Sequence, residues 1–226
     1  PSDSVQDVTL FAKYTLRADE MFLNRMIGGT FEGSNEPDFR EKEVLYLINE
    51  KPKRLQTVVQ SYSSKPYRYV RYVGPKDSHC NIAEAAFYTP NDTTLLKGKV
   101  IGTPGCFQKD GSHEYTNVFD GDVTTSFDYI EPSGGWSGLD LGTPKQIGRI
   151  VYTPRSYDNY IRSGDEYELF YCVNKTGWFS LGIQLSGSDS LVYRKVPANV
   201  MFLLKNYSRG RQERIFVYED GKQRWK

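Results

Sequence analysis

The feature that most constrains this chain is a succession of short strand-like segments from residue 43 onward, separated by turn-forming residues. In the first half these segments are 44–48, 55–59, 67–73 and 83–88, and in the second half they are 136–141, 146–153, 167–173, 178–185, 191–196, 200–205 and 214–218. They are rich in β-branched and aromatic residues, and Gly, Pro, Asn and Asp lie between them, a pattern typical of a sandwich or barrel. The sequence therefore predicts an all-β fold.

Helical signals are few. The best covers residues 16–27, where Leu16, Leu23, Met26 and Ile27 fall near helical spacing before Gly28. An exposed β-strand is the alternative for this stretch. The two interpretations stay open at this point.

A cluster of turn formers without periodicity, Thr-Pro-Asn-Asp-Thr-Thr at residues 89–94, is the best boundary in the sequence. It predicts two tandem modules, an N-terminal one over 1–90 and a C-terminal one over 95–226. The two halves also show weak self-similarity in the order of their apolar segments. This similarity fits either a true repeat or generic β patterning.

Charge and hydropathy exclude two classes of partner. The 29 basic and 28 acidic residues give a net charge of +1, which leaves no overall electrostatic attraction for nucleic acid. No run of about 18 apolar residues occurs, so membrane insertion through a helix is not expected. We therefore expect neither nucleic acid nor a membrane as partner.

Three ordered segments of the second half resemble the discoidin family, also called coagulation-factor type C or galactose-binding-like domains. These segments are Asn-Val-Phe-Asp-Gly-Asp-Val-Thr-Thr-Ser-Phe at 117–127, Trp-Ser-Gly-Leu-Asp-Leu-Gly at 136–142, and Ile-Val-Tyr-Thr-Pro-Arg-Ser-Tyr-Asp-Asn at 150–159 followed by 164–171. In the first half, residues 67–72 and 80–84 resemble only the closing strands of such a domain. The N-terminal module thus resembles a divergent or incomplete relative.

The resemblance implies a jelly-roll β-sandwich fold for both modules and carbohydrate binding without catalysis. Similar tandem modules occur in secreted proteins of gut bacteria that handle glycans. The expected partners are therefore a glycan and an attached or partner catalytic domain, and the expected location is extracytoplasmic: periplasmic, cell-surface or secreted.

The expected ligand-binding residues are Arg155, Asn159, Tyr157, Tyr160, Asp128 and Tyr129. A sugar site needs planar faces for C–H patches, and charged or amide groups for hydroxyls. In sugar-binding relatives, the residues that match Arg155 and Asn159 contact the glycan. Those that bind galactose usually carry a His near residues 127–129, which this chain lacks, so galactose is in doubt. The alternative is an Arg155 paired to Asp128 or Asp158, with tyrosines capping the core.

Asp120, Asp122 and Thr125 place oxygen ligands close together in a tight turn, and relatives hold a structural Ca²⁺ there. The resemblance implies a further acidic ligand from the last strand, for which Glu213 is the nearest candidate. The alternative is an Asp-Gly turn whose carboxylates accept hydrogen bonds from the backbone.

Catalytic signals are weak. The chain has two histidines, and His79 precedes Cys80, but adjacent side chains of a strand point to opposite faces. No phosphate loop, zinc motif or nucleophile elbow occurs. We therefore expect no enzyme. The rival to carbohydrate binding is a scaffold that packs against a protein partner and binds no sugar, and an exposed hydrophobic patch in place of a loop-end cleft would favour it.

Overall fold

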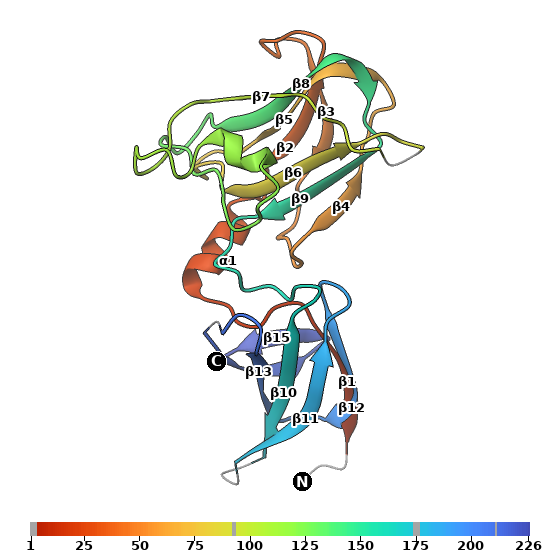
Figure 1. Cartoon of the computed structure of the whole chain (residues 1–226), viewed down its shortest axis with the longest axis vertical. Helices are drawn as coiled ribbons and strands as arrows, with labels where there is room; N and C mark the ends of the chain where they lie inside the picture. Colours follow the sequence, from red (N-terminus) through yellow and green to blue (C-terminus); the bar gives the residue numbers. More distant parts are fainter. Residues whose placement is uncertain (1–3, 92–93, 174–176, 211) are drawn as a thin grey trace. The chain divides into compact units, whose positions relative to one another are not determined.

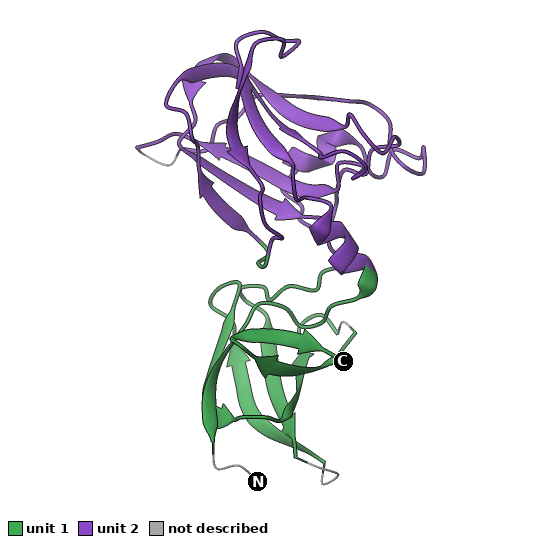
Figure 2. Cartoon of the chain, turned by 180° about the vertical axis from the view of Figure 1, so that it is seen from behind, with its two compact units in different colours: residues 1–17, 53–55, 158–226 green, residues 18–52, 56–157 purple. Residues whose placement is uncertain are grey.

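The computed structural model describes residues 4–91, 94–173, 177–210 and 212–226. It is nearly all β, with 46% strand and 6% helix, which confirms the all-β prediction. The chain forms two compact units (Figures 1 and 2). Unit 1 comprises residues 1–17, 53–55 and 158–226, and unit 2 comprises residues 18–52 and 56–157.

Unit 2 is a sandwich of two antiparallel sheets. Its five-stranded sheet has the order β3 (Lys42–Leu47), β2 (Thr30–Ser34), β5 (Pro66–Val73), β8 (Trp136–Gln146), β7 (Lys99–Gly102). Its three-stranded sheet has the order β4 (Thr57–Gln60), β9 (Arg149–Pro154), β6 (Ile82–Tyr88). The helix α1 (Arg17–Asn24) and the 3₁₀ helix η1 (Tyr115–Phe119) accompany these sheets.

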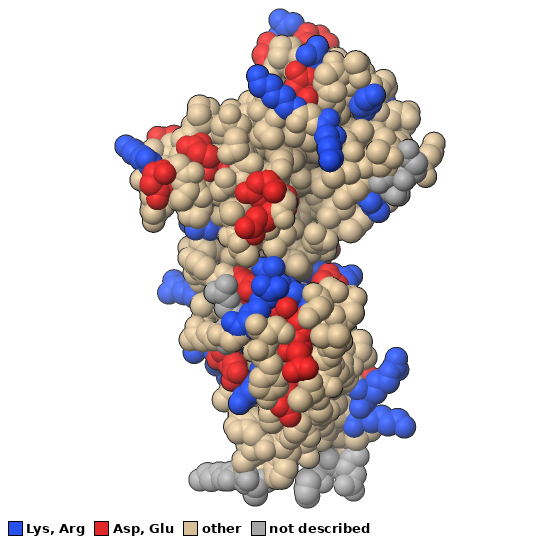
Figure 3. Space-filling model, in the orientation of Figure 1, with Lys and Arg blue, Asp and Glu red and all other residues tan. Residues whose placement is uncertain are grey.

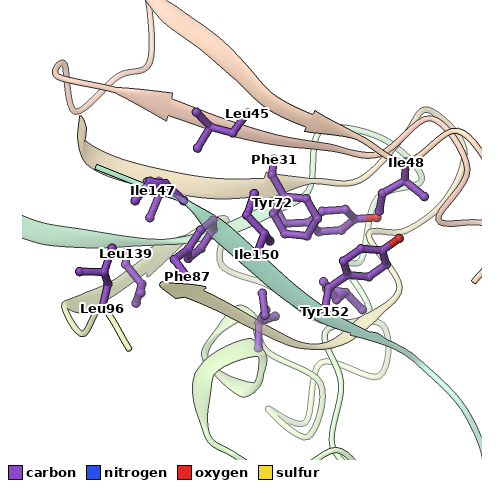
Figure 4. Packing of buried hydrophobic residues seen from close by; sticks show 14 of the residues in the cluster. Phe31, Leu45, Ile48, Tyr72, Phe87, Leu96, Leu139, Ile147, Ile150 and Tyr152 are labelled. Carbon is purple, nitrogen blue, oxygen red and sulfur yellow. The ribbon is translucent and has the colours of Figure 1, made fainter. Parts of the chain in front are cut away.

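The core of unit 2 lies between its two sheets (Figure 4). The ring of Phe31 on β2 lies 5.2 Å from Tyr72 on β5 and 5.9 Å from Phe87 on β6, between ring centroids. Ile150 and Tyr152 of β9 are buried in the same cluster. Since alternate residues of a strand face one side, each sheet turns one apolar face inward, and each fully buried ring contributes about 1.5–3 kcal/mol.

The boundary predicted at residues 89–94 lies inside unit 2. Residues 92–93 of this segment are outside the described part of the chain. Strand β6 precedes this segment and β9 follows it, yet the two strands pair along their length, for example Ala85 with Tyr152. Likewise β5 pairs with β8. The division at 1–90 and 95–226 is therefore corrected: residues 89–94 connect strands of one unit.

Unit 1 has a hydrophobic core of its own, which lies between two sheets. One pairs β1 (Val5–Leu10) with β12 (Leu191–Pro197), and the other has the order β11 (Trp178–Leu185), β10 (Glu166–Cys172), β13 (Met201–Asn206), β14 (Ile215–Glu219), β15 (Lys222–Trp225). Leu10, Leu169, Phe202 and Phe216 are fully buried between them. The Gln223 side chain accepts a hydrogen bond from Phe11 N at 3.0 Å and donates one to Ala12 O at 2.7 Å, which ties β15 to the chain after β1.

The stretch left open between helix and strand forms the helix α1. It ends at Asn24, and Gly28 follows in the left-handed region with φ of 93°, which suits a residue without a side chain. Phe22 and Leu23 are its buried apolar residues. Among the described residues, no helix is long and apolar enough to cross a membrane.

Candidate functional sites

Arg155 follows the last residue of β9 and meets a carboxylate of its own unit. Its Nη1 lies 2.5 Å from Oδ2 of Asp128, and the side chains are 14% and 9% exposed respectively. The guanidinium also lies 4.3 Å from the ring centroid of Phe22 on α1. One face of the guanidinium is thus covered by the protein's own aromatic ring, and a donor edge is used by an internal ion pair.

Asp128 is the centre of a small polar network. Its second oxygen, Oδ1, accepts a hydrogen bond from Asn81 Nδ2 at 2.7 Å. The Asn81 Oδ1 in turn accepts one from Arg25 Nη1 at 3.2 Å. Because each partner of a buried carboxylate offsets its desolvation, this network stabilises a charge that would otherwise be costly to bury.

The other residues of the expected sugar site have different surroundings. Asn159 and Tyr160 belong to unit 1, where they are 1% and 2% exposed. Tyr129 is half-buried, with its ring 5.9 Å from that of Phe127 in the core. Tyr157 is 48% exposed, with its ring 5.6 Å from that of Phe22 and its backbone N–H donating to Asp19 Oδ1 at 2.9 Å.

The contacts of Arg155 match the alternative interpretation of this segment, in which Arg155 forms an internal ion pair. Arg155 pairs with Asp128, and Asp158 pairs with Lys13 and Arg162 in unit 1. Asn159 and Tyr160 are too buried for contact with a ligand at the surface. Of the six expected residues, Tyr157 alone is exposed, at 48%.

The loop with Asp120, Asp122 and Thr125 forms a turn held by its own carboxylates. Asp120 accepts hydrogen bonds from Asp122 N at 2.7 Å and from Thr125 Oγ1 at 2.8 Å. Asp122 accepts one from Thr124 N at 2.9 Å. This pattern is the backbone-bonded Asp-Gly turn that was the alternative to a calcium site.

A third carboxylate, from outside the loop, reaches this turn, and it is that of Glu84 on β6. Its Oε1 accepts a hydrogen bond from Gly121 N at 3.0 Å. Burial, a hydrogen bond to Asp120 and the charge of Asp120 raise the pKa of Glu84 to about 8. Glu213, expected in this role, belongs to unit 1, whereas the loop belongs to unit 2.

The donor set at this turn suits Ca²⁺ chemically. The charge of Asp120 beside Glu84 raises the pKa of Glu84, and a cation between the two carboxyl groups would relieve the same repulsion. Throughout the described ranges, no group of three or more His, Cys, Asp or Glu side chains is placed to hold a metal ion. Bound calcium therefore stays a prediction, with Glu84 in place of Glu213.

Unit 1 carries an apolar surface on the outside of its five-stranded sheet. Register places Phe170, Leu203 and Ile215 in one row across β10, β13 and β14, and Cys172, Met201 and Val217 in the next row. Trp178 on β11 lies opposite Cys172. We call these seven residues the outer face of unit 1. Trp178, Met201 and Ile215 are 38%, 39% and 37% exposed.

Charged residues border the outer face. Glu168 and Lys205 form the next row beyond Phe170 and Leu203, and Lys205 Nζ lies 5.4 Å from the Phe170 ring centroid. Arg224 lies opposite Val217 on β15. The side of the molecule in Figure 3 likewise shows both signs of charge interspersed with uncharged residues. An apolar centre with a polar rim is the usual composition of a protein–protein interface.

Comparison with known proteins adds no family to this description. No family model, no curated protein and no solved structure matches the chain.

Proposed function

We propose that this chain is a non-catalytic β-module that binds a protein partner, and that the loops around Arg155 are structural. The observation that carries the proposal is the outer face of unit 1. Two complete rows of apolar side chains cover three adjacent strands on the side away from the core. A contiguous apolar patch rimmed by charges marks an interaction site, because exposing it to water is unfavourable.

The closed environment of Arg155 supports this proposal over carbohydrate binding. A glycan at that position would have to displace Phe22 from the guanidinium or compete with Asp128 for its N–H groups. Removing one member of a buried ion pair costs about 3–5 kcal/mol, which is more than a few sugar hydroxyls supply in a wet site. Arg155 thus serves the fold of unit 2 at the end of β9.

Unit 2 is, in our proposal, a discoidin-like sandwich with its segments in permuted order. Residues 67–72 and 80–84, which resemble closing strands, lie on β5 and around the start of β6. Residues 136–142 and 150–154 lie on β8 and β9, and these strands pair with β5 and β6. The partial resemblance of the first half and that of the second half therefore describe one sandwich.

The outer face can be tested by hydroxyl-radical footprinting of Trp178 and Met201. In the purified chain both side chains should be oxidised readily, and in extracts of cells that produce the protein they should be protected. Met21, 45% exposed and located in unit 2, is the internal control and should be oxidised equally in both samples. Equal oxidation of Trp178 and Met201 in both samples would contradict the proposal.

The sugar-binding alternative is tested by a glycan array and calorimetry on the wild type and on Arg155→Ala. We expect no glycan to bind in a manner that depends on Arg155. Saturable binding that this substitution removes, while Trp178→Ser leaves it unchanged, would overturn the assignment and restore carbohydrate recognition at the loops.

A further inference from the structure

The three-stranded sheet of unit 2 has a groove on its outer face, opposite the core. Register places Thr153 opposite Glu84, Val151 between Val58 and Ala86, and Arg149 opposite Tyr88. These side chains line a cavity of about 320 Å³, together with Gln56 and Val123. The groove therefore crosses three successive rows of one sheet face.

Two polar groups in this groove have no hydrogen-bond partner in the described part of the chain. Thr153 is 1% exposed, and its Oγ1 is buried without a partner. Arg149 Nε is likewise buried without a partner. Buried polar groups in folded proteins are nearly always hydrogen-bonded, and leaving one unsatisfied costs about 1–3 kcal/mol. Both residues line the cavity, so a ligand bound there could supply the missing partners.

Arg149 supplies the positive charge of the groove. Its guanidinium lies 4.2 Å from the ring centroid of Tyr88, which fixes the plane of the group. Among the described residues it forms no ion pair. Glu84 is the acidic residue of the lining, but it lies two rows away from Arg149 on this sheet face, opposite Thr153, and its Oε1 accepts a hydrogen bond from Gly121 N. The guanidinium is thus a fixed cation without a counter-ion.

The two polar ends of the groove are separated by an apolar floor. Val58, Val151 and Ala86 form the middle row, between the row of Arg149 and the row of Thr153. Arg149 and Thr153 are four residues apart on β9, which corresponds to about 13 Å at about 3.3 Å per residue. A ligand that contacts both must be about as long as an extended tetrapeptide.

We propose that this groove binds a slender carboxylic acid whose carboxylate pairs with the Arg149 guanidinium and whose far end exchanges hydrogen bonds with Thr153. An aliphatic segment of the ligand covers Val58, Val151 and Ala86. Guanidinium groups favour carboxylates because two parallel N–H groups match two oxygens. The chemistry fits both the C-terminal end of a small peptide and a free hydroxy acid. This site is separate from the outer face of unit 1 and does not depend on the function proposed for that face.

Two pairs of probes test the site by calorimetry on the full chain. The peptide Ser-Val-Val-Ala is compared with its C-terminal amide, and 10-hydroxydecanoate is compared with 1,10-decanediol. We expect at least one acid of the two to bind saturably, with its uncharged counterpart at least tenfold weaker. Binding of the peptide alone, or of the hydroxy acid alone, identifies which source of carboxylate the groove accepts.

Variants then assign the binding to this groove. Thr153→Val removes the hydroxyl and keeps the shape, so it should fold as the wild type does and weaken binding about fivefold, the value of one net hydrogen bond. Arg149→Lys keeps the charge without the two-pronged geometry and should weaken binding about tenfold. Lys76→Ala removes one exposed positive charge of unit 2 outside the groove and should have no effect.

The proposal fails if neither acid binds at millimolar concentration. It also fails if the amide and the diol bind as well as the acids, or if Thr153→Val and Arg149→Lys both bind like the wild type. Thermal denaturation without ligand is the second readout: since Thr153→Val removes an unsatisfied hydroxyl, its stability should equal or exceed that of the wild type.

Discussion

Replacing Glu84 by Gln should change how the stability of unit 2 depends on pH. Glu84 lies beside Asp120, and burial together with this carboxylate raises the pKa of Glu84 to about 8 from a usual value of 4.5. The folded state therefore holds the Glu84 proton more tightly than the unfolded state. Gln keeps the shape and a hydrogen-bonding group but cannot ionise.

The sign and size of the effect follow from linkage. Between pH 4.5 and about 8 the folded state binds more protons than the unfolded state, so stability falls as pH rises through this window. A shift of about 3.5 pKa units corresponds to at most about 5 kcal/mol, at 1.36 kcal/mol per unit. Because Glu84 is only about half buried, solvent screening reduces this to about 2 kcal/mol. For a chain of this length, that equals a shift in Tm of about 4–8 °C.

The assay is thermal denaturation of both proteins at pH 5 and pH 9 in the presence of EDTA. The wild type should lose about 2 kcal/mol more than Glu84→Gln between the two values, since other titrating groups are common to both. If Ca²⁺ binds between Glu84 and Asp120, adding it at pH 9 should restore the wild type and leave the variant unchanged. Identical pH profiles of wild type and variant in EDTA would refute the reasoning.

Three further predictions concern the same unit. Asp128→Ala should destabilise unit 2 by about 3–5 kcal/mol because it leaves Arg155 buried without its partner, whereas Asp110→Ala on an exposed loop should change denaturant midpoints little. Gly138→Ala should cost about 3 kcal/mol or more in the same assay, because its Cβ would lie 2.2 Å from Val70 O, while Gly187→Ala has open space and serves as control. Burial raises the pKa of the Cys80 thiol, so Cys80 should react with iodoacetamide at pH 8 only after unfolding, as mass spectrometry of the native and denatured chain would show.

The strands could be predicted from the sequence because their signal is local. Segments 44–48, 67–73 and 83–88 overlap β3, β5 and β6, since alternation of apolar residues between turn formers depends on near neighbours alone. The division into units was wrong because it depends on strand pairing. A turn-rich segment such as 89–94 looks the same in sequence whether it joins two domains or two sheets of one sandwich.

The contact of Glu84 with the turn at Asp120 was missed for the same reason. The resemblance implied an acidic residue on the closing strand, and residues 80–84 were matched to a closing strand that ends in Glu84. Glu213 was chosen because the closing strand was expected to follow the turn in the chain. Chain order, however, does not determine which strands are neighbours in a sheet, and a match by sequence segment would have identified Glu84.

Hydrogen bonds to the start of β6 hold the loop that contains Asp128 in place. Phe127 N donates to Ile82 O at 2.8 Å and Tyr129 N donates to His79 O at 2.7 Å, so the segment before and at the start of β6 runs alongside the loop. The same neighbours provide Asn81 for Asp128 and Glu84 for the turn at Asp120. Since these contacts fix the Asp128 carboxylate in the position where it meets Arg155, these two side chains, which the resemblance assigns to a ligand, are engaged by the protein itself. The two surfaces that we propose as binding sites, the outer face of unit 1 and the groove over β9, therefore lie on sheet faces turned away from the cores.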